Sequence, residues 1–380
     1  MQMKRKTIIG VNGILGILIL ILCQLASCDN KKETITLNII PLASTIGNYN
    51  ILNLSEYAKE IRYIPLETND SALVGDIRQI SYENDKILIK DAFQNCFLFD
   101  ENGKYCKKIG QSGQGPDDYV SLQQLFIMEN LIFQTDRLKI LIYDSNGYLV
   151  KKSNLQSILS EYHTSQYSIV PLKKDSFVMD VVSAFNHYPK AVLIKTDQSD
   201  AIIIREYPNY IELKKSRPGY YGFEIGTMYR FKDEVRIYKA INDTIFTIGK
   251  DTEMKAAFIF ELGKYKPTIS FLERKENISK SDDFITPNMI YESSNHLFIE
   301  FLFGNHAPEP FVYRRFVDGS VQSRNTRVYS VFDKLTGELT LMRQPTKGVF
   351  GFKNDIDNGP VIWPRYISSD NELVSYIYIS

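Results

Sequence analysis

The sequence predicts an all-β protein, specifically a six-bladed β-propeller. Apolar runs of strand length recur along the chain, and a hairpin-containing segment is repeated 44 residues further on. The 24 Tyr and 22 Phe residues also favour strands. A period of about 40–45 residues with several strands per unit is typical of propeller blades. Division of the mature chain without its lead-in segment by this period gives roughly seven units, but the later units are longer, so six blades with insertions agree better. Seven blades or a large β-sandwich are the alternatives.

The first 27 residues, 1–27, are predicted to be an export leader. Residues 4–6 are basic, Ile8–Leu22 is apolar, and Leu25–Cys28 reads Leu-Ala-Ser-Cys. Secretory leaders have this order of regions, and the closing cysteine resembles the lipobox of bacterial lipoproteins. The resemblance implies cleavage before Cys28 and acylation of Cys28, with palmitate as a typical acyl chain. A membrane-spanning anchor is the alternative, because the apolar run approaches a spanning length.

Residues 28–54 are predicted to be a tether and lead-in segment, and residues 55–380 the propeller domain. More than one acyl chain on Cys28 would anchor the protein stably to a membrane. We expect the outer membrane of the cell envelope; Asp29 leaves the inner membrane open, and either face is compatible. Without the leader the chain loses three basic and no acidic residues, so its formal charge falls from 0 to −3. Nucleic acid demands a basic face, so no nucleic-acid partner is predicted.

The clearest repeat relates residues 95–110 to residues 139–154. NCFLFDENGKYCKKIG and KILIYDSNGYLVKKSN align without gaps, so that Asp100 corresponds to Asp144. The Asp-x-Asn-Gly segment is typical of a hairpin built on a type I turn, with aspartate first and glycine in the left-handed position. We therefore interpret these aspartates as turn residues rather than catalytic ones.

Segments with weaker similarity to the repeat complete the predicted elements. Further hairpins are expected over residues 191–207, 236–248 and 327–342. Short helices or helical turns are expected over residues 53–62, 121–126 and 268–276.

Two cysteines, Cys96 and Cys106, remain as thiols if the leader is removed and Cys28 is acylated. The expected hairpin makes them diagonal neighbours about 7–8 Å apart, whereas a disulfide requires Cα atoms closer than about 7 Å. We expect two free, mostly packed cysteines.

Residues 107–119, KKIGQSGQGPDDY, contain three glycines directly after an apolar run. Such loops can bind phosphate, but this spacing matches neither the dinucleotide-binding nor the P-loop pattern. Asp117 and Asp118 would also repel an anion. We predict a connection between two blades.

Four segments together resemble a known family: IRYIPLET, KKIGQSGQGPDDY, INDTIFTI and WPRYISSDNELVSYI. They are similar to the six-bladed β-propeller lipoproteins of anaerobic Gram-negative bacteria, NHL-like propellers that are mostly uncharacterised. The resemblance implies the fold, and through broader relatives it implies binding of proteins, peptides or glycans. Family members continue past SYI, so we expect the last blade to be incomplete or closed by an amino-terminal strand such as Ile61–Leu66.

The most ligand-like segments are residues 303–316 and residues 363–365. They combine amphipathic aromatic residues with arginines, which are enriched in recognition patches. A place in the core is the competing interpretation for Trp363. The candidate ligand-binding residues are His306, Tyr313, Arg314, Trp363 and Arg365.

No catalytic residue, metal ligand or cofactor is predicted, because the four histidines lack zinc-ligand spacing and no nucleophile elbow occurs. The sequence thus predicts a cell-envelope lipoprotein whose propeller is a binding platform for a glycan, peptide or protein partner. A propeller-type lyase or hydrolase acting on carbohydrate or peptide is the alternative.

Overall fold

A computed structural model describes residues 38–164, 167–181, 190–197, 199–207, 227–239, 242–272, 278–309, 311–314, 321–324 and 327–378. All of these lie within the unit Asn38–Ser380. Strands account for most regular elements in these ranges, which confirms the all-β prediction. None of the described helices has the length and apolar character needed to cross a membrane.

The first three sheets are antiparallel meanders of four consecutive strands each. The first contains β3 (Ile77–Glu83), β4 (Lys86–Asp91), β5 (Cys96–Asp100) and β6 (Tyr105–Lys108). The second contains β7 (Gln124–Met128), β8 (Leu131–Thr135), β9 (Lys139–Asp144) and β10 (Leu149–Asn154). The third contains β11 (Tyr167–Lys173), β12 (Ser176–Val181), β13 (Lys190–Asp197) and β14 (Asp200–Tyr207). The second and third sheets join where β10 pairs with β14.

The next two sheets each gain a parallel strand from the beginning of the unit. The fourth contains β15 (Thr227–Phe231), β16 (Glu234–Tyr238), β17 (Thr244–Ile248) and β18 (Met254–Phe260), with β1 (Asn38–Ile40) added beside β18. The fifth contains β19 (Thr286–Glu292), β20 (His296–Leu302), β23 (Arg327–Asp333) and β24 (Leu339–Met342), with β2 (Tyr49–Asn50) added beside β24. These added strands cover the outer edges of both sheets.

Two hairpins and several short helices complete the described elements. The hairpins are β21 (Phe311–Arg314) with β22 (Val321–Arg324), and β25 (Tyr366–Ile367) with β26 (Leu373–Val374). The α-helices are α2 (Leu42–Thr45), α3 (Gln156–Glu161) and α4 (Ile269–Leu272). The 3-10 helices are η1 (Leu54–Glu56), η2 (Gly263–Tyr265), η3 (Ile278–Asp283) and η4 (Gly304–His306).

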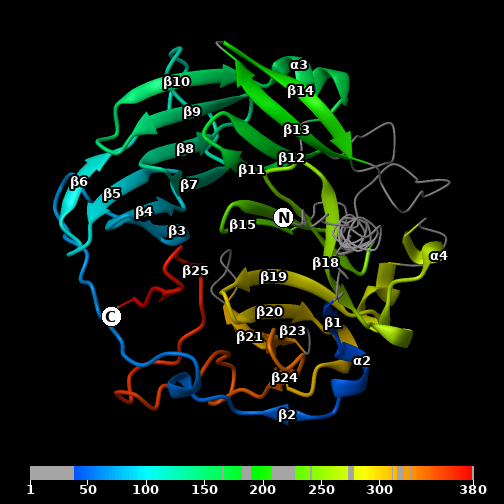
Figure 1. The fold of residues 1–380 in the computed structure, drawn as a ribbon. Helices are drawn as coiled ribbons and strands as arrows, with labels where there is room; N and C mark the ends of the chain where they lie inside the picture. Colours follow the sequence, from blue (N-terminus) through cyan, green and yellow to red (C-terminus); the bar gives the residue numbers. More distant parts are fainter. Residues whose placement is uncertain are drawn as a thin grey trace, which may run out of the picture. The chain divides into compact units, whose positions relative to one another are not determined.

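The first strands of successive sheets contact one another around a common centre (Figure 1). The contacts run from β3 to β7, β11, β15, β19 and β25, and β25 contacts β3 again. Each neighbouring pair encloses an apolar cluster: Leu98 of β5 packs with Leu141 of β9, for example, and Phe258 of β18 with Phe332 of β23. Sheets arranged face to face around an axis in this way form a β-propeller.

Glutamines on the innermost strands link neighbouring sheets. Gln79 of β3 accepts a hydrogen bond from the Leu125 N–H (3.0 Å) and donates one to the Leu125 carbonyl (2.6 Å). Gln124 of β7 likewise accepts a hydrogen bond from the Ile169 N–H of β11 at 2.9 Å. The two glutamines lie 45 residues apart in the chain, close to the predicted repeat period.

The fourth and fifth sheets are also joined by a buried charge network around Glu292, the last residue of β19. Its carboxylate accepts hydrogen bonds from Arg236 Nε (3.0 Å), Lys334 Nζ (2.7 Å) and the Tyr229 hydroxyl (2.9 Å). The Glu292 side chain is fully buried, and those of Arg236 and Lys334 are 8% and 13% exposed. Because buried charges are costly without partners, this network holds the two sheets in one arrangement.

The predicted repeat is confirmed in atomic detail. Asp100 Oδ1 accepts hydrogen bonds from the N–H groups of Asn102 (3.0 Å) and Lys104 (2.9 Å). Asp144 Oδ1 accepts the corresponding hydrogen bonds from the N–H groups of Asn146 and Tyr148. The glycines of both turns have φ near +80°, at 79° and 77°. The hairpins predicted over residues 191–207, 236–248 and 327–342 are also confirmed, except that residues 240–241 lie outside the described residues.

The glycine-containing segment after β6 connects two sheets, as predicted, and its own carboxylate occupies the loop. Asp118 accepts hydrogen bonds from Gln111 Nε2 (2.8 Å) and from the Gly115 N–H (2.9 Å). A Cβ added at Gly113 would lie 2.2 Å from Asp118 Oδ2, so a larger residue there would have to displace this carboxylate. The loop thus binds its own acid where a phosphate loop would bind an anion.

Two predictions about local structure are wrong. Residues 121–126 are not helical, because Leu125 and Ile127 pack between sheets and draw Gln124–Met128 into β7. Ile61–Leu66 forms no strand; Pro65 cannot donate to a sheet, and the chain instead runs past the β5–β6 turn, where the Glu67 N–H binds the Gly103 carbonyl.

Of the other predicted helices, only Leu54–Glu56 of residues 53–62 is helical, as a 3-10 turn. Ile269–Leu272 is helical within residues 268–276, and the rest of that range, from residue 273, lies outside the described residues.

Both cysteines of the first sheet are free, as predicted, but only one of them is packed. Cys96 is completely buried, whereas Cys106 is exposed. A bulge pairs Lys107 with Leu98 and Tyr105 with Phe99, which leaves Cys106 out of the pairing register.

Candidate functional site

The structure separates the predicted ligand residues into groups. His306 lies in η4, where its ring packs edge-on against Tyr265 at 4.8 Å and its Nε2 lies 3.1 Å from the Asp283 carbonyl oxygen. Tyr313 and Arg314 belong to β21, whose side chains are outside the described part of the structure. His306 therefore has neighbours of its own, and its described contacts do not involve residues 363–365.

Trp363 belongs to the core, the interpretation that competed with ligand contact. Its side chain is 4% exposed and packs against Tyr329 and Phe352, with ring centroids 4.5 Å and 5.4 Å away. The indole Nε1 is buried and has no hydrogen-bond partner among the described residues. Trp363 is thus placed to support neighbouring side chains rather than to form the contact surface.

Arg365 lies just before β25 and is exposed, in contrast to Trp363. Its backbone N–H donates to the Val374 carbonyl of β26 at 2.8 Å, which fixes its position. Burial alone would lower the pKa of the Arg365 guanidinium. The nearby phenols of Tyr329, Tyr291 and Tyr376 and the Glu300 carboxylate outweigh this effect, so the pKa lies above its ordinary value. The guanidinium is therefore firmly charged and sits among aromatic hydroxyl groups.

Glu300 is the buried acid of this region. Its side chain is 3% exposed and accepts hydrogen bonds or ion pairs from Asn288 Nδ2 at 2.7 Å and Arg327 Nη1 at 3.2 Å. Among the described residues no carboxylate forms an ion pair with Arg365. Taken together, Arg365, Arg327 and Glu300 carry one net positive charge.

The phenols beside Arg365 are neutral hydrogen-bonding groups. Burial, chiefly, raises the pKa of both Tyr291 and Tyr329 above the ordinary value of 10. Their hydroxyl groups can donate and accept hydrogen bonds. We define Arg365, Tyr291, Tyr329 and Tyr376 as the Arg365 cluster, which places one cation near phenols from β19, β23 and the carboxyl-terminal segment. Tyr329 is buried, and the Tyr376 hydroxyl donates a hydrogen bond to the Ile77 carbonyl at 3.1 Å.

Sequence reasoning selected Arg365 but missed the other residues around it. Tyr291 and Tyr329 lie in ordinary strand runs, and no local motif distinguishes them. Glu300 carried a usable signal, because it interrupts the apolar run Leu297–Leu302, LFIEFL, in which a charge must be buried and paired.

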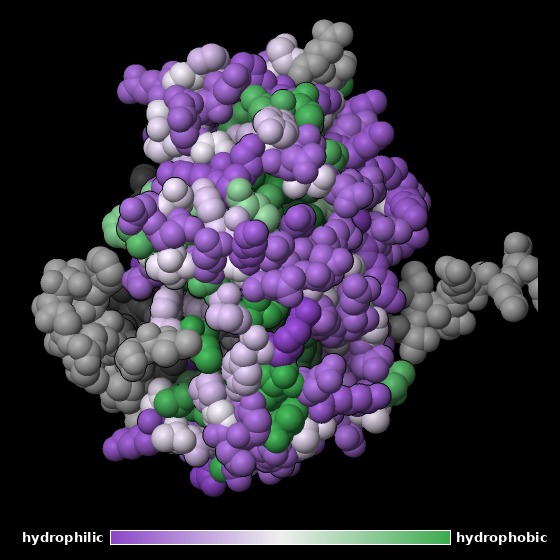
Figure 2. All heavy atoms as spheres, turned by 90° about the vertical axis from the view of Figure 1, so that its left-hand side faces the viewer, coloured by the Kyte–Doolittle hydropathy of each residue, from purple (hydrophilic) through white to green (hydrophobic). Residues whose placement is uncertain are grey.

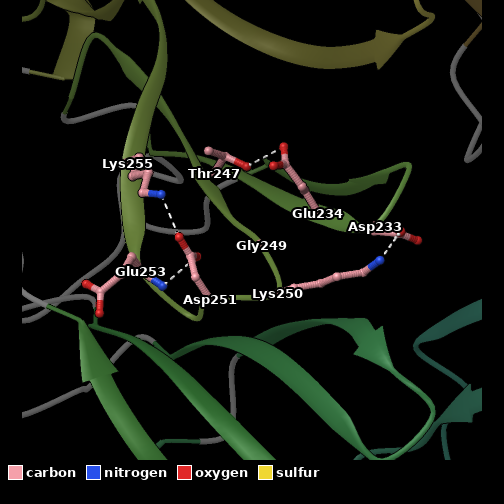
Figure 3. Close-up of a pocket in the computed structure, with 8 residues that line it drawn as sticks. All are labelled: Asp233, Glu234, Thr247, Gly249, Lys250, Asp251, Glu253 and Lys255. Atoms are coloured by element: carbon pink, nitrogen blue, oxygen red, sulfur yellow. Dashed lines mark hydrogen bonds and ion pairs between the residues drawn. The ribbon is translucent and has the colours of Figure 1, made fainter. Parts of the chain in front are cut away.

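A separate hollow of about 390 Å³ lies at the hairpin turns of the fourth sheet (Figure 3). Its charged side chains pair with one another: Lys250 lies 2.8 Å from Asp233, and Lys255 lies 2.5 Å from Asp251. Glu253 is paired with Arg205 at 2.7 Å. Since these charges are already neutralised by neighbours, the hollow offers a weaker case for ligand binding than the Arg365 cluster.

The face shown in Figure 2 is mostly hydrophilic, and hydrophobic side chains appear there in small separate areas. The most exposed large apolar side chains in the described part come from different sheets, such as Phe93 (77%) and Leu335 (81%). Scattered apolar residues are normal on a protein surface. This face therefore favours polar rather than apolar recognition.

Several solved structures are similar to this chain. A Bacteroides fragilis protein inferred to be exported is 20% identical, with 80% of each chain covered and a TM-score of 0.56. A member of the DUF4221 family from Bacteroides vulgatus is 13% identical over 73% of this chain and 83% of that one, with a TM-score of 0.45. A streptogramin B lyase is 12% identical over 80% and 91%, with a TM-score of 0.41. The first similarity supports the fold.

No curated protein matches this sequence. The family model described as a domain of unknown function, DUF4934, matches residues 37–380. The match covers all the sheets described above, and the chain belongs to the DUF4934 family.

Proposed function

We propose that this protein is an exported lipoprotein of the cell envelope whose six-bladed propeller serves as a binding platform for a glycan, peptide or protein partner. The observation that carries the binding role is Arg365, an exposed and firmly charged arginine that no described carboxylate neutralises. Arginine and tyrosine are enriched at the energetic centres of binding sites.

The lipoprotein part rests on the amino terminus. The basic residues 4–6, the apolar Ile8–Leu22 and the Leu-Ala-Ser-Cys ending at Cys28 agree with a leader followed by a lipidated cysteine. The similarity to a Bacteroides fragilis protein inferred to be exported agrees with secretion. The outer membrane is the proposed destination.

The blade count rests on the order of contacts. Five sheets of four or more strands and the β25–β26 hairpin follow one another, and β25 lies between β19 and β3. We assign the β25–β26 hairpin, with the segment leading into it, as the sixth and smallest blade. The apolar clusters on its two sides, around Trp363 and around Phe99, support this assignment.

Lipid attachment can be tested by labelling cells with a palmitate analogue. We expect the wild-type chain to incorporate the label and the Cys28→Ser chain to incorporate none. Equal labelling of both chains would overturn attachment at Cys28, and a labelled chain that still begins at Met1 would favour the spanning anchor.

Binding can be tested by screening the full chain, purified in detergent, against glycan and peptide panels by thermal shift. We expect stabilisation by one ligand class, with the bound ligand recovered chemically unchanged. Recovery of a cleaved product would instead support the lyase or hydrolase alternative. Absence of any stabilising ligand or protein partner would overturn the platform.

A further inference from the structure

Three buried polar atoms at the contact between the first two sheets have no hydrogen-bond partner among the described residues. They are the hydroxyl oxygens of Tyr119 and Tyr143 and the Oε1 of Gln134. The three side chains are 0%, 3% and 0% exposed, so bulk water does not reach them. Buried polar atoms in native proteins nearly always have a partner, either in the protein or in an ordered water molecule. Three such atoms in one place therefore point to a partner that they share.

The three side chains meet beside Gly110. A Cβ added at Gly110 would lie 2.6 Å from the Tyr143 hydroxyl oxygen, 3.0 Å from Gln134 Oε1 and 3.3 Å from Tyr119 Cε1. Any residue other than glycine would therefore crowd these groups. Both tyrosines also belong to the apolar cluster that packs the first sheet against the second.

The hydrogen-bonding roles of these groups are fixed by their surroundings. Gln134 Nε2 donates to the Ile109 carbonyl at 2.9 Å, so the other atom of the amide, Oε1, must be an acceptor. Burial raises the pKa of both phenols above the ordinary value of 10, so both hydroxyl groups keep their protons. The site thus presents two O–H donors and one amide acceptor, and these groups are all neutral.

We infer that a single water molecule binds beside Gly110, where it accepts hydrogen bonds from both phenols and donates one to Gln134 Oε1. A water molecule has two lone pairs and two hydrogens, and buried waters typically make about three hydrogen bonds to groups that otherwise lack partners. A hard cation instead requires a shell of oxygen acceptors, often carboxylates, and two O–H donors with one amide oxygen do not provide it.

The bound water links the first two sheets. Ile109 and Gly110 directly follow β6 of the first sheet, whereas Gln134 belongs to β8 and Tyr143 to β9 of the second. The apolar cluster supplies most of the contact, and the water adds polar bonds within it. This inference does not depend on the proposed binding function.

Tyr119→Phe and Tyr143→Phe test the site through the sign of their effect on stability. Phe99, at the position of the repeat that corresponds to Tyr143, is fully buried, so phenylalanine suits this position. The full chain in detergent is unfolded with urea. If the hydroxyls bind a water, each variant loses a hydrogen bond, and the unfolding equilibrium constant should rise about fivefold or more. Tyr148→Phe on the same hairpin, whose side chain is 65% exposed, should leave the constant unchanged.

The opposite sign is expected if no water is bound, because removal of an unpaired buried hydroxyl removes a cost. An unchanged or lower unfolding constant in both phenylalanine variants therefore overturns the inference. A crystal structure of the wild-type chain tests it without any variant. We expect the density of one water oxygen within about 2.6–3.2 Å of both phenol oxygens and Gln134 Oε1. Direct hydrogen bonds between these side chains without such density, or density larger than a water molecule, also overturn the inference.

Discussion

Replacement of Glu292 by glutamine tests whether the buried charge network holds the fourth and fifth sheets together. Glutamine keeps the size of the side chain but removes the charge that faces Arg236 Nε at 3.0 Å and Lys334 Nζ at 2.7 Å. Both cations would remain buried, and loss of one partner from a buried ion pair costs about 3–5 kcal/mol. We expect the free energy of unfolding to fall by this amount.

The corresponding change in melting temperature follows from the size of the unit Asn38–Ser380. Its entropy of unfolding is about 0.7 kcal/mol/K by the usual value per residue, so the expected decrease in Tm is about 4–7 °C. Differential scanning calorimetry of the full chain measures it directly, with urea unfolding as an independent check on the free energy.

Asp233→Asn is the matched control. Asp233 pairs with Lys250 at 2.8 Å, but the side chains are 62% and 73% exposed, and exposed pairs contribute about 0–1 kcal/mol. We expect a Tm change of about 1 °C or less. If Glu292→Gln lowers Tm no more than this control does, the argument that the network joins the sheets is refuted.

Three further outcomes are expected. Iodoacetamide should modify Cys106 in the native chain but Cys96 only after unfolding, because Cys96 is buried and burial raises the pKa of its thiol to about 12. Peptide mapping identifies the modified cysteines, and labelling of both in the native chain would contradict this expectation. Burial lowers the pKa of His296 below 6.5, so the unfolded chain binds more protons than the folded chain at acidic pH, and stability is lost as pH falls below about 6.5. Calorimetry at pH 7.5 and 5.5 should therefore show a smaller difference in Tm between the two pH values for His296→Gln than for the wild-type chain. Gln79→Ala leaves both backbone groups of Leu125 unpaired, so urea unfolding should show a loss of about 1–3 kcal/mol, and no loss would contradict the linking role.

Local features of the fold were predictable from the sequence. The turns at Asp100 and Asp144 depend on residues within four positions of each other, so their pattern is visible in the chain itself. The strand runs are visible for the same reason. The pairing of β1 with β18 joins residues about 220 positions apart, such as Asn38 and Phe258, and no local pattern encodes it.

The candidate site was predictable only in part. Arg365 stood out by composition, but the burial of Trp363 depends on Tyr329 and Phe352, which the sequence does not bring near it. The helix predicted over residues 121–126 was wrong for a related reason, since tertiary packing overrides local preference. The partners of Arg365 come from strands whose neighbours are set by the closure of the ring.

The most direct test of a membrane-anchored binding platform is cofractionation of the screened ligand with cell membranes. The account predicts that membranes from cells making the wild-type chain retain the ligand, that the Arg365→Gln chain stays on the membrane without ligand, and that a chain with a plain cleavable leader in place of residues 1–28 binds the ligand in the soluble fraction. Retention of ligand by membranes carrying Arg365→Gln would contradict the assigned site. Membrane retention of the chain without residues 1–28 would contradict the anchor at Cys28.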